Sequence, residues 1–217
     1  MLALYPLSIK TLSDLLGGAV TPSQASSSLR TLHSVLLVPE NQDNVVRIFH
    51  KSFPDFLMDS SRCTNNNFFI NPSIYHKEIL LSCLGIMEKR LKLNICKLPN
   101  TVYLQEVEDL PMLRTIYIGG ALEYACKFWA SHLVKVPSSD NNFEKIDRVL
   151  EKFFTTNFLF WVEVLVLTGN LDIGIYALND VEQWYILVSN MEGIYWNSHS
   201  YLLRQEIPAS GQEMQGF

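Results

Sequence analysis

The apolar positions at the start of the chain predict two short helices. Residues 8–16 carry apolar side chains at the three- and four-residue spacing of a helix, and Gly17-Gly18 would end it. Thr21-Pro22 predicts the start of a second helix, because threonine caps helix N-termini and proline is tolerated at the first helical position. We expect this second helix to run towards His33.

The pattern then changes to one that is typical of strands. Two apolar runs, 34–39 and 44–50, are joined by a polar turn at 40–43 and predict a β-hairpin. A short helix is expected over 52–59. The order helix, helix, hairpin, helix over residues 1–60 is that of a winged-helix domain without its first helix.

A second region, in which longer helices are predicted, follows the polar loop at 60–67. Asn71-Pro72 predicts the start of a long helix. Its apolar stripe is expected to comprise Tyr75, Ile79, Leu80, Cys83, Leu84, Met87 and Leu91. A weaker helical pattern over 106–118 is interrupted by Pro111, and Gly119-Gly120 precedes another amphipathic helix, with apolar positions Leu122, Ala125, Phe128, Trp129 and Leu133.

The third region predicts three more helices after a polar linker. Asn141 and Glu144 have the spacing of a capping box, and the helix that follows has the apolar face Phe143, Ile146, Val149, Leu150 and Phe153. A nearly all-apolar helix is expected over 157–168, closed by glycine and asparagine. A last helix is expected over 171–190, with the apolar face Ile175, Leu178, Val181, Tyr185 and Val188. Short polar joints between them favour an antiparallel array similar to the start of an α-solenoid.

The chain is therefore expected to be mainly α-helical. A partial winged-helix domain with a small β-hairpin is predicted over residues 1–60, an α-helical array over 61–191, and a loosely ordered tail over 192–217. Of the 217 residues, 48% are hydrophobic and only 18% are charged, which excludes a disordered chain. The formal net charge of −5 argues against a dedicated nucleic-acid binder, because such proteins carry a basic surface.

Targeting signals and cysteine usage favour a cytoplasmic protein. Residues 1–20 have no cationic start and a short, interrupted apolar run, unlike a signal peptide. The longest apolar stretch, 153–167, is shorter than the ~20 residues that span a bilayer, and it contains Asn157 and Glu163. The four cysteines form no close pair in the sequence, so we expect buried thiols and no disulfide framework: Cys63, Cys83, Cys96 and Cys126.

Candidate chemistry is sparse. The sequence contains no phosphate-binding Gly-x-x-x-x-Gly-Lys-Ser/Thr loop, no Gly-x-Ser-x-Gly elbow and no Cys-x-x-Cys or His-x-x-x-His pair. The histidines are scattered: His33, His50, His76, His132 and His199. Glu163, on an apolar helix, is either a buried functional acid or a residue at an exposed edge or paired with Arg or Lys. We expect no enzyme activity, no catalytic residue, no cofactor and no metal site.

Residues 45–57, Val-Val-Arg-Ile-Phe-His-Lys-Ser-Phe-Pro-Asp-Phe-Leu, contain a recognisable motif. The segment resembles the end of the winged-helix domain of NACHT-type STAND NTPases, where a strand delivers a histidine and a Ser-Phe-x-x-Phe-Leu helix follows. Further segments are similar, in the same order, to the large fungal NACHT proteins, in many of which WD repeats follow: 6–17, 32–36, 61–63, 91–96, 122–126, 129–133 and 161–165. The resemblance covers roughly residues 4–190.

The resemblance implies a role for His50. In the family, the matching histidine approaches the β-phosphate of bound ADP and helps to hold the winged helix against the nucleotide domain. An imidazole can donate such a hydrogen bond to a phosphate oxygen. The residues alone allow another interpretation, in which His50 caps the next helix or packs beside Phe49. Because the chain has no phosphate-binding loop, His50 would sense ADP only with a nucleotide domain supplied, and hydrolysis is not implied.

The resemblance therefore implies a non-enzymatic regulatory segment that couples a nucleotide domain to a sensor in signalling. Such a segment is expected from a truncated gene model, a degenerate paralogue or a real short protein. Its partner would be a NACHT nucleotide domain, in cis or in trans, with no nucleic acid and no membrane partner. The alternative is a winged-helix nucleic-acid-binding protein, whose recognition helix 22–33 would carry only Arg30 as a cation. A winged helix that lacks one helix also predicts exposed apolar patches over 1–60 and self-association through them.

Overall fold

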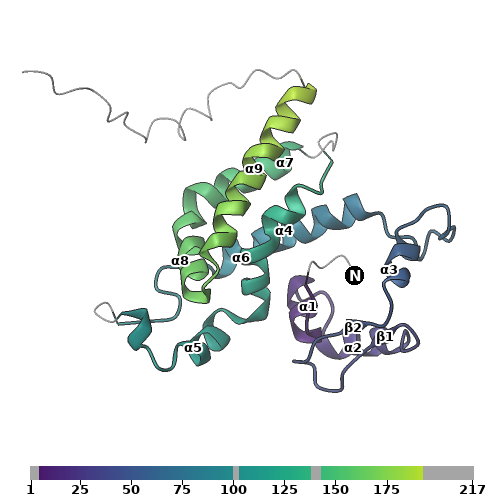
Figure 1. Ribbon diagram of the computed structural model, residues 1–217, viewed down its shortest axis with the longest axis horizontal. Coiled ribbons are helices and arrows are strands. Elements are labelled where there is room, and N and C mark those ends of the chain that lie inside the picture. The colour runs from purple at the N-terminus through teal and green to yellow at the C-terminus, as the bar shows by residue number, and fades with distance from the viewer. Residues whose placement is uncertain (1–4, 100–102, 138–142, 193–217) are drawn as a thin grey trace, which may run out of the picture.

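The computed structural model describes residues 5–99, 103–137 and 143–192. This part of the chain is mainly α-helical with one two-stranded antiparallel hairpin near the N-terminus, as the sequence predicts (Figure 1). The predicted tail from 193 onward and the capping residue Asn141 lie outside the described residues. No helix in the described ranges is long and apolar enough to cross a bilayer.

The N-terminal elements follow the predicted order. They are α1 (Ile9–Leu15), α2 (Pro22–Arg30), β1 (Leu36–Leu37), β2 (Arg47–Ile48) and α3 (Ser52–Leu57). Local caps explain where the two first helices begin. The Ser8 hydroxyl accepts a hydrogen bond from the Thr11 amide, and Thr21 forms a complete capping box with Gln24.

Two sequence predictions for this region are too long. The helix α2 ends at Arg30 and does not reach His33, because the chain turns and the His33 amide donates to the Arg30 carbonyl. The paired strands have two residues each, in the register Leu36↔Ile48 and Leu37↔Arg47. The sheet is extended on one side by an isolated bridge between Ser8, just before α1, and Val45.

The centre of the molecule consists of two long antiparallel helices, and a short helix lies between them in the sequence. These are α4 (Pro72–Arg90), α5 (Leu110–Tyr117) and α6 (Gly119–Leu133), with a 3₁₀ turn at Leu104–Glu106. The Asn71 side chain caps α4, which confirms the predicted start. The pattern over 106–118 predicts a helix that Pro111 interrupts. In the structure, Pro111 lies in the first turn of α5, where proline is tolerated, so the helix begins here and is not interrupted.

The last helices differ from the prediction at one joint. No turn separates the first two: α7 (Phe143–Lys152) continues through a π-helical turn (Phe153–Asn157) into α8 (Phe158–Thr168). A π turn inserts an extra residue into a helix and so changes its apolar phase without breaking it, which is why the pattern reads as two helices. A left-handed Gly169 then ends α8, and α9 (Leu171–Glu192) follows.

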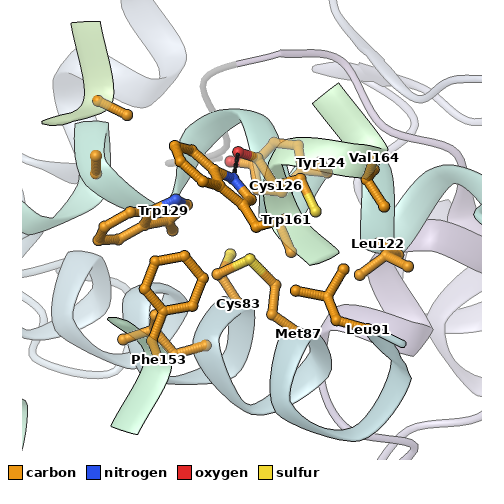
Figure 2. Packing of buried hydrophobic residues seen from close by; sticks show 14 of the residues in the cluster. Cys83, Met87, Leu91, Leu122, Tyr124, Cys126, Trp129, Phe153, Trp161 and Val164 are labelled. Atoms are coloured by element: carbon orange, nitrogen blue, oxygen red, sulfur yellow. Dashed lines mark hydrogen bonds between the residues drawn. The ribbon is translucent and has the colours of Figure 1, made fainter. Parts of the chain in front are cut away.

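The core lies where α4, α6, α8 and the π turn meet. Trp129 and Trp161 are almost fully buried and contact each other edge to face, with ring centroids 6.0 Å apart. The indole of Trp161 donates to the Cys126 carbonyl at 2.8 Å, so its polar atom is satisfied inside the core (Figure 2). Phe153 completes this aromatic group from the π turn.

The buried face of α4 is the predicted one except at the start of the helix, whereas the buried face of α9 is rotated from the predicted one. The residues of the predicted α4 stripe that are buried are Leu80, Cys83, Leu84, Met87 and Leu91. At the start of α4, His76 is buried and Tyr75 is 42% exposed. On α9, the residues that pack inward are Ala177, Val181, Trp184 and Val188, whereas Ile175 and Leu178 are exposed. Apolar residues occur nearly all round α9, so the periodicity alone does not select the inner face.

The N-terminal elements are joined to the helical bundle through α1. The Ser82 hydroxyl on α4 donates to the Leu15 carbonyl at the end of α1. On α6, Gly120 faces the Thr11 side chain so closely that a Cβ at this position would lie 2.5 Å from the Thr11 hydroxyl. A glycine is therefore needed for α1 to approach α6.

Candidate functional site

His50 lies on the surface between β2 and α3 and caps the start of that helix. Its Nδ1 accepts a hydrogen bond from the Ser52 amide at 3.1 Å and lies 2.8 Å from the Ser52 hydroxyl. A backbone amide can only donate, so Nδ1 is the acceptor and the neutral ring carries its proton on Nε2. The capping interpretation from the sequence is thus observed, and it leaves the Nε2–H as a donor on an exposed side chain.

The hairpin face next to His50 is apolar and open. Side chains alternate along a strand, so Leu37, its cross-strand partner Arg47, and Phe49 share the outer face, opposite the buried Leu36. Leu37 is 49% and Phe49 59% exposed. The exposed apolar residues expected over 1–60 are present here and on the adjoining elements: Tyr5, Leu16, Leu37, Phe49 and Phe56.

Uncompensated positive charge accompanies this face. Arg47 and Lys51 flank His50 and make no ion pair with any described residue. By contrast, Arg62 is engaged with Asp59 at 2.6 Å, and hydrogen bonds from Ser61 and Arg62 lower the pKa of Asp59 to about 2. We use the name His50 face for His50 and its exposed neighbours along the chain and across the hairpin: Leu37, Arg47, Phe49, His50 and Lys51. These residues supply an imidazole donor, two cations and two apolar side chains.

A pair of histidines lies inside the bundle, and nothing in the sequence predicts it. His76 of α4 and His132 of α6 approach each other with an Nδ1–Nδ1 distance of 2.8 Å, and the Tyr124 hydroxyl lies 2.8 Å from His132 Nε2. His132 is fully buried and His76 nearly so. The two histidines are 56 positions apart, and no local spacing signals that they meet.

The environment of this cluster keeps it neutral. Burial is the main cause that lowers the pKa of His132 to about 4, with further contributions from His76 and Lys135. Burial also lowers the pKa of His76, followed by the effect of Lys135. Two neutral imidazoles can share one Nδ1 proton in a hydrogen bond, whereas two protonated rings would repel each other. The cluster therefore functions as a hydrogen-bonded link between α4 and α6.

Glu163 proves to be an anchor for a loop. Its two carboxylate oxygens accept hydrogen bonds from the backbone amides of Asn94 and Ile95, at 3.0 and 2.9 Å. Asn94 has a positive φ of 50°, so two successive amides point towards the acid. The role is structural, and its partners are backbone groups, which neither of the two interpretations from the sequence included.

The cysteines are buried free thiols, as expected. Burial raises the pKa of Cys83 to about 12 and raises that of Cys126 further beyond the ordinary range. Thiols that stay protonated are poor nucleophiles and poor metal ligands. Among the residues the structure describes, no three His, Cys, Asp or Glu side chains gather in a way that could hold a metal ion.

Comparisons with known proteins identify no relative of this chain. No family model, no curated protein and no solved structure matches the chain.

Proposed function

We propose that this chain is a non-enzymatic regulatory and interaction segment of a NACHT-like STAND signalling protein of the fungal NACHT/WD-repeat type, acting in the cytoplasm. It would bind a NACHT nucleotide domain, in cis or in trans, and transmit the nucleotide state to the helical bundle. The sequence itself has no phosphate-binding loop, so the nucleotide is held by the partner.

The pairing around the hairpin supports a partial winged-helix domain. In that fold, a short strand that precedes the last two helices adds to the second strand of the hairpin. Here Ser8, which precedes α1, bridges to Val45, and the Val46 amide donates to the Leu7 carbonyl at 3.0 Å. The helices α1 and α2, the hairpin and this extra pairing are the parts expected of a winged helix without its first helix, and they support the proposal in this respect.

The observation that carries the proposal is the free donor of His50. Its Nδ1 accepts the hydrogen bond from the Ser52 amide, so the neutral ring carries its proton on Nε2, and the side chain is exposed. A phosphate oxygen accepts such a bond, and Arg47 and Lys51 favour the approach of an anion. Helix capping and phosphate sensing would use different nitrogens of the ring, so the observed cap is compatible with the proposed phosphate contact.

The connection from α1 to the bundle supplies a route for coupling. The contact of Thr11 with Gly120 and the hydrogen bond from Ser82 to Leu15 tie the N-terminal elements to α4 and α6. A partner that shifts the His50 face would displace α1 against a closely packed helix pair.

The test is a titration of the full chain with a recombinant fungal NACHT nucleotide domain, with and without ADP. We expect binding that is stronger with ADP, and His50→Ala to raise Kd about tenfold or more, as for loss of a hydrogen bond to a charged group. His33→Ala, which removes another exposed histidine, is the control and should leave Kd unchanged. Absence of binding, or equal Kd values for both variants, would refute the proposal.

The same preparation tests the alternative. A winged-helix nucleic-acid binder would bind duplex DNA with an affinity that falls steeply with salt. Arg30 is the single cation of α2, which argues against this outcome.

A further inference from the structure

The last helix has two apolar sides, and among the described residues only one of them packs against the rest of the bundle. Ala177, Val181, Trp184 and Val188 pack inward. The opposite side, which we call the outer face of α9, exposes Leu171, Ile175, Tyr176, Ile186 and Leu187. Ile175 and Tyr176 are 68% and 69% exposed. Figure 1 shows the C-terminal end of α9 projecting past α7 at the top of the view.

The outer face also has a uniform charge. Residues 153–192 contain no Lys, Arg or His, whereas they include five acids: Glu163, Asp172, Asp180, Glu182 and Glu192. Asp172 and Glu182 are exposed on α9 and form no ion pair with any described residue. With 3.6 residues per turn, both lie among the apolar residues of the outer face. The surface is thus apolar and acidic, with no cation supplied by its own helices.

We propose that the outer face of α9 binds a cationic amphipathic helix of another protein. The helix of 22 residues is about 33 Å long, so it can pack against four to six turns of a partner helix. Apolar side chains at i, i+4 spacing, such as Leu171 and Ile175, form ridges, and the side chains of a facing helix pack into the grooves between such ridges. Lysine or arginine beside the apolar stripe of the partner would pair with Asp172 and Glu182.

The acidic residues of the outer face of α9 argue against a membrane or a second copy of the chain as the occupant of this face. Cellular membranes that attract amphipathic surfaces are anionic, and an acidic face is repelled by them. A second copy of α9 would bring acid against acid, which is unfavourable at the close distances of a helix pair. This inference concerns a surface separate from the His50 face and does not depend on the function proposed for that face.

The test uses the full chain and an 18-residue peptide probe. The probe is built from Leu at helical spacing with Lys on both flanks and carries a fluorescent label. Two controls are a scrambled peptide of the same composition and an analogue with Glu in place of Lys. Anisotropy at 50 mM NaCl is expected to show binding of the cationic probe at least tenfold tighter than of either control. Higher salt should weaken that binding several-fold.

Variants of the protein locate the site. Ile175→Ser should weaken binding of the probe about tenfold, because an interfacial aliphatic side chain is lost. Asp172→Asn should weaken it two- to fivefold and reduce the salt dependence. Ile116→Ser on α5 removes an equally exposed isoleucine, 61% exposed, and is the matched control that should change nothing.

Several results would overturn the proposal. Equal binding of the cationic and scrambled peptides would show non-specific adsorption, and no effect of Ile175→Ser would place the site elsewhere. If sedimentation shows a dimer that Ile175→Ser converts to a monomer and that the probe does not dissociate, the occupant is a second copy. If the full chain does not bind the probe at all, the outer face is not open to a cationic helix.

Discussion

Acidification should destabilise this protein through the buried histidine pair. In the unfolded chain, His132 takes up a proton near pH 6.5, whereas burial beside His76 lowers its pKa in the folded protein to about 4. The contribution of the neutral His132 to the free energy of unfolding is fully present above pH 6.5, and it is lost as the pH falls from 6.5 towards 4. His76 is shifted in the same direction and adds to the loss.

The magnitude follows from the two pKa values. Below pH 6.5, each pH unit costs about 1.4 kcal/mol until the folded protein itself takes up the proton. His132 has no exposed surface, so solvent screening does not reduce this figure. Between pH 7.5 and 5.0, we therefore expect His132 to lower the free energy of unfolding by about 2 kcal/mol. Asp59 does not interfere, because its stabilisation is lost only at pH values below its ordinary pKa of 3.8.

Urea denaturation followed by tryptophan fluorescence at the two pH values measures this difference, because Trp129 and Trp161 lie in the core. In His132→Asn, the difference between pH 7.5 and 5.0 should fall by at least half, whatever the variant's stability at pH 7.5. His33→Asn, an exposed histidine, should behave as the unchanged protein. NMR titration of the ring nitrogens gives a second readout that needs no variant.

Two results would refute the reasoning. One is equal stability of the unchanged protein at pH 7.5 and 5.0. The other is an NMR midpoint near 6.5 for His132, which would mean that the ring is hydrated in solution and does not form the buried link to His76.

Two further predictions concern backbone contacts. Glu163→Ala should lower the free energy of unfolding by about 2–3 kcal/mol, because the part-buried amides of Asn94 and Ile95 lose a charged acceptor. Urea denaturation measures this loss, and a value below about 0.5 kcal/mol would show that the loop does not need this anchor. Gly120→Ala should destabilise by about 1–3 kcal/mol through collision with Thr11. Adding Thr11→Ala should recover most of that loss in a double-mutant cycle, and additive effects would contradict the close approach of α1 to α6.

Local signals in the sequence predicted where most helices begin and end. Thr21 and Asn71 carry capping groups just before a proline, and both caps form as expected. Gly169 ends α8 in the left-handed conformation that glycine adopts without strain. These positions are determined within one turn of chain, so they are independent of the rest of the fold.

Periodicity was less reliable where apolar residues are abundant. On α9, Ile175 and Leu178 were expected inside, yet Ala177 and Trp184 occupy the inner face. A helix with apolar residues on every side can pack in more than one rotation, and the neighbouring α6 selects one. The continuous joint between α7 and α8 is not evident from the sequence for a related reason, since a π turn shifts the apolar phase in the same way as a break.

The sequence by itself determined the helical class, the hairpin, the burial of the thiols and the position of His50 between strand and helix. Only the tertiary structure decided which side chains meet across long separations: His76 with His132, and Glu163 with the amides of Asn94 and Ile95. The physical reason is that capping and turn formation depend on neighbours in the chain, whereas buried polar contacts depend on which helix faces are brought together by packing. A histidine or glutamate in an apolar helix indicates that a partner must exist, and only the packed bundle shows which one it is.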